Sequence, residues 1–264
     1  MHGKTKAMRR SALLTILLFG TTALMTLPLL IFETAAEADM RDYLFNQDYD
    51  TSKKGEFELE FYNDLNMPNK DNSDTYNLLQ QYELEYGITD HLQMALYNVV
   101  TWNRAQDWRQ DAWKLEGKYR FLESGELPVD IALYGEYKNP NGSSAARSDE
   151  VEMKLILGKN IGAWNVTGNF VAEREINQHE AWQLEYTLGA RCPVTPRLHV
   201  GLELKESLGN SEEFGPNQGN HKLQLMPIVG FSPTPKTRIL FGPAIGLTHH
   251  SDDIQLKSIV SVEF

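Results

Sequence analysis

Apolar and polar residues alternate along most of the chain that follows Gly55. In the stretch 113–121, with the sequence WKLEGKYRF, apolar residues occupy nearly every odd-numbered position and charged residues occupy the positions between them. A period of two residues is typical of a β-strand whose two faces meet different surroundings. Twelve segments of this kind follow one another, at residues 56–63, 76–86, 91–102, 112–121, 129–138, 150–158, 163–173, 181–191, 197–205, 221–231, 238–248 and 254–264.

The last segment ends with the chain itself, on an aromatic residue. Val260, Val262 and Phe264 share its apolar face. A terminal strand of this form is typical of bacterial outer-membrane barrels, and we expect these three residues to form the signal that the barrel-insertion machinery recognises. An even number of strands also suits a barrel in the outer membrane. The pattern therefore predicts an all-β fold: a single closed antiparallel transmembrane β-barrel of about twelve strands.

The connections between the predicted strands alternate in length. Short ones lie at 87–90, 122–127, 159–162, 192–196 and 232–237, and longer polar ones lie at 64–75, 103–111, 139–149 and 206–220. Outer-membrane barrels have short periplasmic turns and longer extracellular loops, so this order supports the barrel. Prolines at 227 and 243 predict local irregularity in two strands, because proline lacks the ladder donor.

The first 38 residues have the features of a secretory signal peptide. Four basic residues precede an apolar run at 11–32, and Ala36-Glu37-Ala38 matches a small-x-small cleavage site. An uncleaved helical anchor is the alternative, because the run is long enough to cross a bilayer. The expected organisation is a signal peptide at 1–38, a short periplasmic lead-in at 39–54 and an outer-membrane barrel at 55–264.

The composition excludes some classes of function. The mean hydropathy of −0.42 is too polar for a helical membrane protein but suits a barrel, whose strands turn half of their residues inward. Without residues 1–38, 21 basic residues stand against 34 acidic ones, a net charge of −13. Such a chain should not bind nucleic acid. The single cysteine, Cys192, cannot form an internal disulfide.

Charged residues gather on the polar faces of the predicted strands, which would line the lumen if the apolar faces meet lipid. The acidic residues of these faces are Glu58, Glu60, Glu83, Glu85, Glu116, Glu136, Glu152, Glu173, Glu185 and Glu203. The basic ones are Lys114, Lys118, Arg120, Lys138, Lys154, Lys205 and Lys257. Walls of opposite charge would produce a transverse field that orients a polar solute. A network of ion pairs that closes the lumen is an equally open alternative.

Aromatic residues lie near the ends of the predicted strands. Amphipathic rings settle at the two interfaces of a bilayer, so we expect girdles that contact outer-membrane lipid. The predicted girdle residues are Tyr86, Trp113, Phe121, Tyr137, Trp164, Trp182 and Phe231.

One cluster raises the possibility of catalysis or metal binding. His249, His250 and Ser251 precede two aspartates in the last predicted loop, which suggests a nucleophile with its base or a metal site. Neighbouring residues of an extended chain point in opposite directions, so a solvated loop tip is the favoured interpretation. We predict no catalytic residue, no metal and no cofactor.

Several segments resemble a known family. "FELEFYND", "YELEYGITDHLQMALYN", "WKLEGKYRFL", "LEYTLGARCPVTPRLHVGLEL" and "SIVSVEF" are similar to segments of the meta-pathway phenol-degradation outer-membrane proteins. The resemblance covers most of the chain after residue 38 and implies uptake of small aromatic or hydrophobic compounds. The predicted function is passive passage of a small solute across the bacterial outer membrane. An outer-membrane hydrolase with a site at the extracellular loops, and a closed structural or interaction barrel, are the alternatives.

Overall fold

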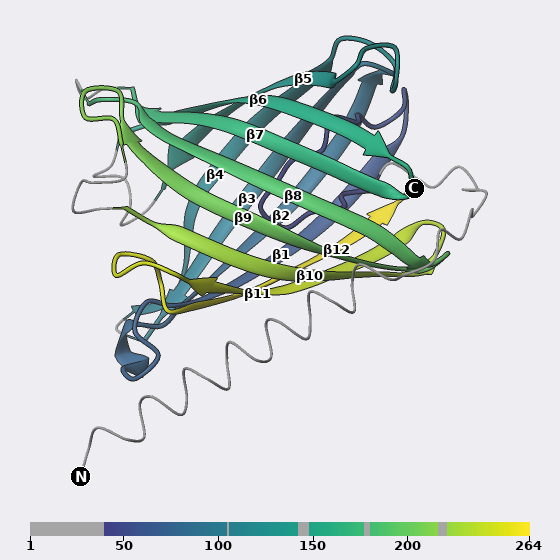
Figure 1. Ribbon diagram of the computed structural model, residues 1–264. Coiled ribbons are helices and arrows are strands. Elements are labelled where there is room, and N and C mark those ends of the chain that lie inside the picture. Colours follow the sequence, from purple (N-terminus) through teal and green to yellow (C-terminus); the bar gives the residue numbers. More distant parts are fainter. Residues whose placement is uncertain (1–39, 105, 142–147, 177–179, 216–220) are drawn as a thin grey trace. The chain divides into compact units, whose positions relative to one another are not determined.

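Twelve strands pair in antiparallel fashion, each with its neighbours in the chain, and β1 pairs with β12 to close a barrel (Figure 1). The computed structural model describes residues 40–104, 106–141, 148–176, 180–215 and 221–264. No helix in these ranges is long and apolar enough to span a membrane. The predicted closed all-β barrel is confirmed. The elements are β1 (Phe57–Met67), η1 (Ser73–Thr75), β2 (Asn77–Thr89), β3 (Leu92–Asn103), β4 (Gln106–Arg120), β5 (Asp130–Pro140), β6 (Glu150–Ile161), β7 (Trp164–Glu175), β8 (Gln183–Thr195), β9 (Leu198–Asn210), β10 (Leu223–Thr234), β11 (Thr237–Gly246) and β12 (Ile254–Glu263).

Several strands continue beyond the ends expected from the sequence. β1 extends to Met67 and β9 to Asn210, so parts of two predicted loops are strand. The loop expected at 103–111 is wrong, because β4 already begins at Gln106. Leu65 and Met67 continue the alternation of β1. In β4, register shifts in the β3–β4 ladder put Trp108 out of phase with Trp113, so the alternation breaks where the strand begins.

The expected irregularity at the two prolines is present. The ladder between β10 and β11 pairs Leu225 with Ile245 and resumes only where Val229 pairs with Phe241. This register would set Pro227 opposite Pro243, and neither residue can donate a backbone hydrogen bond. Both neighbouring ladders, β9–β10 and β11–β12, continue through this level, so the barrel stays closed.

The outer face of the barrel is apolar. Leu96 of β3, Leu133 of β5 and Phe170 of β7 are about half exposed, at 56%, 47% and 55% of their surface. The residues directly before and after each of them on its strand turn inward. Large apolar side chains exposed in such numbers require an apolar solvent rather than water. The predicted girdle residues lie on this face or at its edges, and two ring pairs, Phe57 with Tyr86 and Trp113 with Tyr137, have centroids 4.5 and 5.5 Å apart.

Phe264 closes the barrel at the end of β12. Its backbone N–H donates to the carbonyl of Phe57 over 2.9 Å, while the residue is 61% exposed. We expect deletion of Phe264 to lower the yield of folded barrel in the outer membrane several-fold, since the exposed terminal ring is free to be recognised during insertion. Quantification of the heat-modifiable band in outer-membrane fractions measures this yield. A normal yield would contradict the assignment of the terminal strand as the assembly signal.

Candidate functional site

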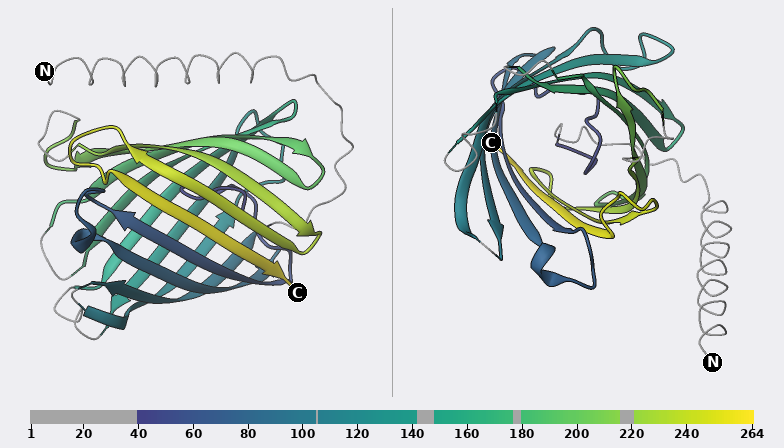
Figure 2. Two further views of the ribbon diagram at one scale, coloured as in Figure 1. Left: turned by 90° about the horizontal axis from the view of Figure 1, so that it is seen from below. Right: turned by 90° about the vertical axis from the view of Figure 1, so that its left-hand side faces the viewer.

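A segment ahead of β1 lies inside the barrel. Residues 40–52, here called the plug, cross the lumen, and the end-on view in Figure 2 shows them as a purple trace within the ring of strands. Met40, Tyr43, Leu44 and Asn46 are at most 2% exposed. The sequence predicts a short periplasmic lead-in at residues 39–54, whereas the structure packs residues 40–52 against the lumen wall. Lys53 and Lys54 are exposed. The predicted signal peptide at 1–38 lies outside the described residues.

The lumen wall carries rows of like charge. Glu116, Glu136, Glu152 and Glu173 lie directly opposite one another on β4 to β7 and form one acidic row. Two residues further along the strands, Lys114 lies opposite Lys138. Like charges in direct opposition destabilise a sheet, so these rows need compensation from elsewhere.

Ion pairs between the rows supply this compensation. Lys114 Nζ lies 3.1 Å from the carboxylate of Glu136, and Lys154 Nζ lies 2.9 Å from that of Glu152. Further round the wall, Lys205 pairs with Glu185 at 3.1 Å. All of the predicted lumen charges lie on the inner face, and the structure adds Asp64, which pairs with Lys257 at 2.6 Å. The sequence had placed Asp64 in a loop, because the predicted first strand ended one residue earlier.

Two arginines of the wall hold the start of the plug. Asp42 forms ion pairs with Arg191 of β8 and Arg238 of β11, each guanidinium taking one of its carboxylate oxygens. Arg238 also donates to the carbonyl of Met40 over 2.8 Å. Burial raises the pKa of Asp42, but the two arginines lower it by more, so the pKa lies below its ordinary value and Asp42 stays ionised.

A buried glutamate holds the middle of the plug. Three successive backbone N–H groups, those of Leu44, Phe45 and Asn46, donate to the Glu203 carboxylate over 2.6 to 2.8 Å. The side-chain amide of Asn46 adds a fourth donor at 2.8 Å. Glu203 is completely buried, and these four donors replace the hydrogen bonds that water would otherwise give its carboxylate.

The rest of the plug follows the wall toward β1. Gln47 exchanges two hydrogen bonds with Asn169 of β7, at 2.7 and 2.9 Å, and Asp48 lies 3.6 Å from Lys118 of β4. Burial and the nearby charge of Asp48 raise the pKa of Asp50 to about 6. Ser52 then bonds to the carboxylate of Glu85. Polar contacts thus hold the plug at successive points around the lumen.

Apolar packing and glycines of the wall also fit the plug to the barrel. Leu44 packs in a cluster with Met226, Ile228 and Leu240, all nearly or fully buried, so the inner faces are not wholly polar as the sequence had indicated. Wall glycines lie beneath plug side chains. A Cβ at Gly189 would come within 2.7 Å of the Tyr43 ring, and one at Gly242 within 2.8 Å of Leu44. The wall is therefore shaped to receive this segment.

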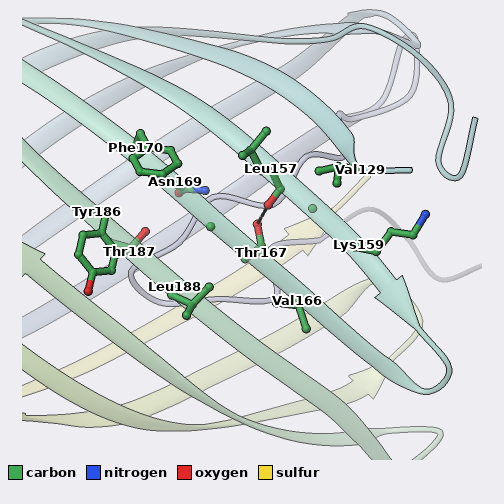
Figure 3. A pocket seen from close by; sticks show the side chains of 12 residues that line it. Val129, Leu157, Lys159, Val166, Thr167, Asn169, Phe170, Tyr186, Thr187 and Leu188 are labelled. Carbon is green, nitrogen blue, oxygen red and sulfur yellow. Dashed lines mark hydrogen bonds between the residues drawn. The ribbon is translucent and has the colours of Figure 1, made fainter. Parts of the chain in front are cut away.

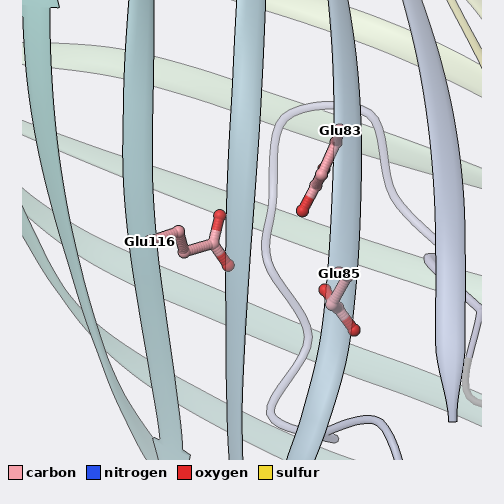
Figure 4. A group of neighbouring side chains, drawn as sticks. All are labelled: Glu83, Glu85 and Glu116. Carbon is pink, nitrogen blue, oxygen red and sulfur yellow. The ribbon is translucent and has the colours of Figure 1, made fainter.

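Three carboxylates gather beside the plug. Glu83, Glu85 and Glu116 each offer an oxygen, and these oxygens lie within 4.8 Å of one another (Figure 4). Oxygen ligands of this kind suit hard cations. In the structure, however, the carboxylates already accept hydrogen bonds: Glu83 from Tyr62, Glu85 from Ser52 and Gln93, and Glu116 from Tyr97. The group acts as part of the lumen's hydrogen-bond network.

The last loop does not assemble the hydrolase site considered from the sequence. The Ser251 hydroxyl lies 2.8 Å from Thr248 Oγ1, donates to the carbonyl of Leu223 and accepts from its N–H. These contacts fix the turn between β11 and β12. Within the described residues, the hydrogen bonds of Ser251 involve neither His249 nor His250. The two histidines are exposed, as expected of a loop tip, whereas Ser251 is buried.

A shallow cavity of about 310 Å³ lies on the outer face of β6 to β8 (Figure 3). It forms where Gly168 leaves a gap among Leu157, Val166, Phe170 and Leu188. Its lining is almost entirely apolar, which is appropriate for a surface that meets lipid.

Sequence reasoning missed the residues that bind the plug. Arg191, Arg238, Asn169 and His199 all turn inward. The alternating pattern predicts this for Asn169 and His199, and the same alternation would have placed Arg191 and Arg238 there. What the pattern could not provide is their common partner, because the plug has no periodicity of its own.

The fold and the charged lumen together define an outer-membrane type of β-barrel. The COG4313 outer membrane channel from Pseudomonas putida F1 is similar over 84% of this chain and 100% of its own, with a TM-score of 0.60 and 14% sequence identity. A KdgM porin in complex with disordered oligogalacturonate is similar over 78% of this chain and 98% of its own, with a TM-score of 0.53 and 8% identity. Such identities show the fold alone. No protein-family model matches the sequence, and no curated protein does either.

Proposed function

We propose that this protein is a passive outer-membrane channel for small solutes, whose lumen the plug occupies at rest. The observation that carries the proposal is the nature of the plug's contacts. They are mostly ion pairs and hydrogen bonds to a charged wall, and water can replace such contacts when the segment moves. The plug is also covalently joined to the barrel only at its β1 end once the expected cleavage near Asp39 has occurred.

The chemistry of the wall favours polar or charged solutes. Charged side chains retain some exposure in the lumen, as for Lys205 at 38% and Glu185 at 27%. A transverse field between such groups orients a dipolar solute. The family resemblance implies small aromatic or hydrophobic compounds, and among these an ionised aromatic fits the lumen better than a hydrocarbon does. The similar KdgM porin, with its oligogalacturonate, is consistent with a charged solute.

The same proposal places the protein in the outer membrane of a bacterium. Export through a cleaved signal peptide, insertion by the barrel-insertion machinery at the Phe264 strand, and a lipid contact along the apolar outer face all belong to it. The outer face supports it most directly, because its half-exposed leucines and phenylalanines need a hydrocarbon environment.

Tethering the plug to the wall tests the channel. The Asn46 side chain accepts a hydrogen bond from Thr187 Oγ1 over 2.7 Å, so cysteines at these two positions can be joined by a short bifunctional thiol reagent that is itself reducible. Cys192 is first replaced by alanine. Crosslinked protein in planar bilayers should show no conductance, and a reducing agent should restore that of the uncrosslinked variant. Equal conductance before and after reduction would contradict a role for plug movement.

A closed structural or interaction barrel is the second candidate. The hydrogen bonds that hold the plug around the lumen, and the wall glycines that make room for its side chains, favour this candidate because they keep the plug in place. The same experiment separates the two, since a permanently closed barrel conducts in neither state.

A further inference from the structure

Two arginines of the lumen wall meet where the plug begins. Arg191 and Arg238, three strands apart on β8 and β11, converge on the Asp42 carboxylate. His199 of β9 adds a third nitrogen-bearing group to this cluster, and Asp42 is among the charges that act on it. A planar guanidinium binds a carboxylate better than a lysine does, because its N–H groups match the two oxygens.

The site has donor capacity that Asp42 does not use. Arg191 Nε and His199 Nε2 are buried and make no hydrogen bond to any described residue. Arg191 therefore pairs with Asp42 through Nη2 and uses only one nitrogen of the Nε–Nη2 edge of its guanidinium. The Asp42 carboxylate is tethered to the plug, whereas the carboxylate of a free solute could turn to use both Nε and Nη2 of Arg191.

The wall is built to accommodate this cluster. A Cβ at Gly230 would come within 2.0 Å of the His199 ring, and one at Gly201, opposite Arg191, within 3.0 Å of the Arg191 Cβ. Glycine at these two positions leaves room for the His199 imidazole and for the base of the Arg191 side chain. Ser232 supports Arg238 from the far side, at 3.4 Å from Nε.

We propose that Arg191 and Arg238 form a binding site for the carboxylate group of a small solute, and that Asp42 is the occupant that such a solute displaces. This deepens the proposed channel function by naming the class of solute. Asp42 is suited to be displaced by a solute because it lies near the end of the plug that the expected cleavage leaves untethered. Losing Asp42 would release the start of the plug, so solute binding and plug movement would be one event.

The tethering of Asp42 to the barrel sets how strongly it competes with a free carboxylate for the two arginines. A group joined to the protein by a short flexible segment acts at an effective concentration in the millimolar range. A free carboxylate must exceed that concentration to replace Asp42 in the native chain. Removing the Asp42 carboxylate should therefore reveal the site to ligands that the native protein binds poorly.

Binding of butyrate to the purified full-length mature protein tests the proposal, with isothermal titration calorimetry as the readout. We expect Asp42→Ala to bind butyrate at least about tenfold more tightly than the native protein, by loss of the tethered competitor. Butyramide, which has nearly the same size and no charge, should not bind. In the Asp42→Ala protein, Arg191→Gln should abolish butyrate binding, and Arg191→Lys should weaken it because the charge remains without the fork.

Asp48→Ala is the matched control, because Asp48 is also a plug aspartate with a cationic partner but lies away from the arginine pair. Its butyrate affinity should equal that of the native protein. The proposal is overturned if Asp48→Ala and Asp42→Ala gain affinity equally, if butyramide binds as butyrate does, or if folded Arg191→Gln and Arg191→Lys proteins retain full binding. Heat-modifiable migration establishes folding in each case.

Failure of the channel proposal would give a different experimental result from failure of the carboxylate site. Binding requires no conductance, so specific butyrate binding by a protein that admits no solute into liposomes would support the carboxylate site and contradict the channel.

Discussion

Removal of residues 40–52 is expected to increase the single-channel conductance several-fold. The plug crosses the lumen, and residues such as Tyr43, Leu44 and Asn46 are fully or almost fully buried against its wall. Without them, Glu203, Asn169 and the Arg191–Arg238 pair would face water, and the polar wall would conduct ions as larger barrels do. Planar-bilayer recordings of the purified variant, in parallel with the native protein, measure the change.

A wedge provides a second way to displace the plug without shortening the chain. Gly189→Val would drive a side chain into the space of the Tyr43 ring, since a Cβ alone would approach it to 2.7 Å. We expect a conductance between those of the native and the deleted proteins. Gly135→Val is the matched control, because a Cβ at that position contacts nothing within 4 Å. Native conductance in both the deletion and the wedge variants, with folding intact, would contradict the plug's role.

Replacement of Leu155 by arginine is expected to destabilise the barrel by about 2–4 kcal/mol. Leu155 is 39% exposed on the outer face in the middle of β6, between Leu133 and Phe170 on the neighbouring strands. An arginine there must carry its charge into hydrocarbon or distort the bilayer. Equilibrium unfolding in urea, from lipid vesicles, gives the free-energy difference.

Lys154, which directly precedes Leu155 on β6, is the control residue. Lys154 points into the lumen, where it pairs with Glu152 at 2.9 Å and lies over the Tyr134 ring. Lys154→Gln should cost less than about 1 kcal/mol, because lumen water and the amide replace much of the pairing. Similar losses from both substitutions would mean that the two faces of β6 had been exchanged.

The sequence alone determined the barrel. A period of two residues decides which side chains share a face, and this is a local property that each strand carries in full. Twelve such strands in succession left few folds to choose from. The same alternation predicted that Glu116 and Lys118 point inward and Leu115 outward, as they do in the structure. Residues 106–111 were missed because register shifts in the β3–β4 ladder put Trp108 out of phase with Trp113 and so break the alternation.

The tertiary structure alone decided what fills the barrel. Residues 40–52 have no period, so no local property of the sequence distinguishes a plug from a lead-in outside. Their position depends on partners more than 100 residues away, such as Glu203 for Leu44 and Arg238 for Asp42. Those pairings exist only when the closed sheet brings β8, β9 and β11 around one space. Alternation along a strand determines which way a side chain points, whereas closure of the sheet determines what it meets there.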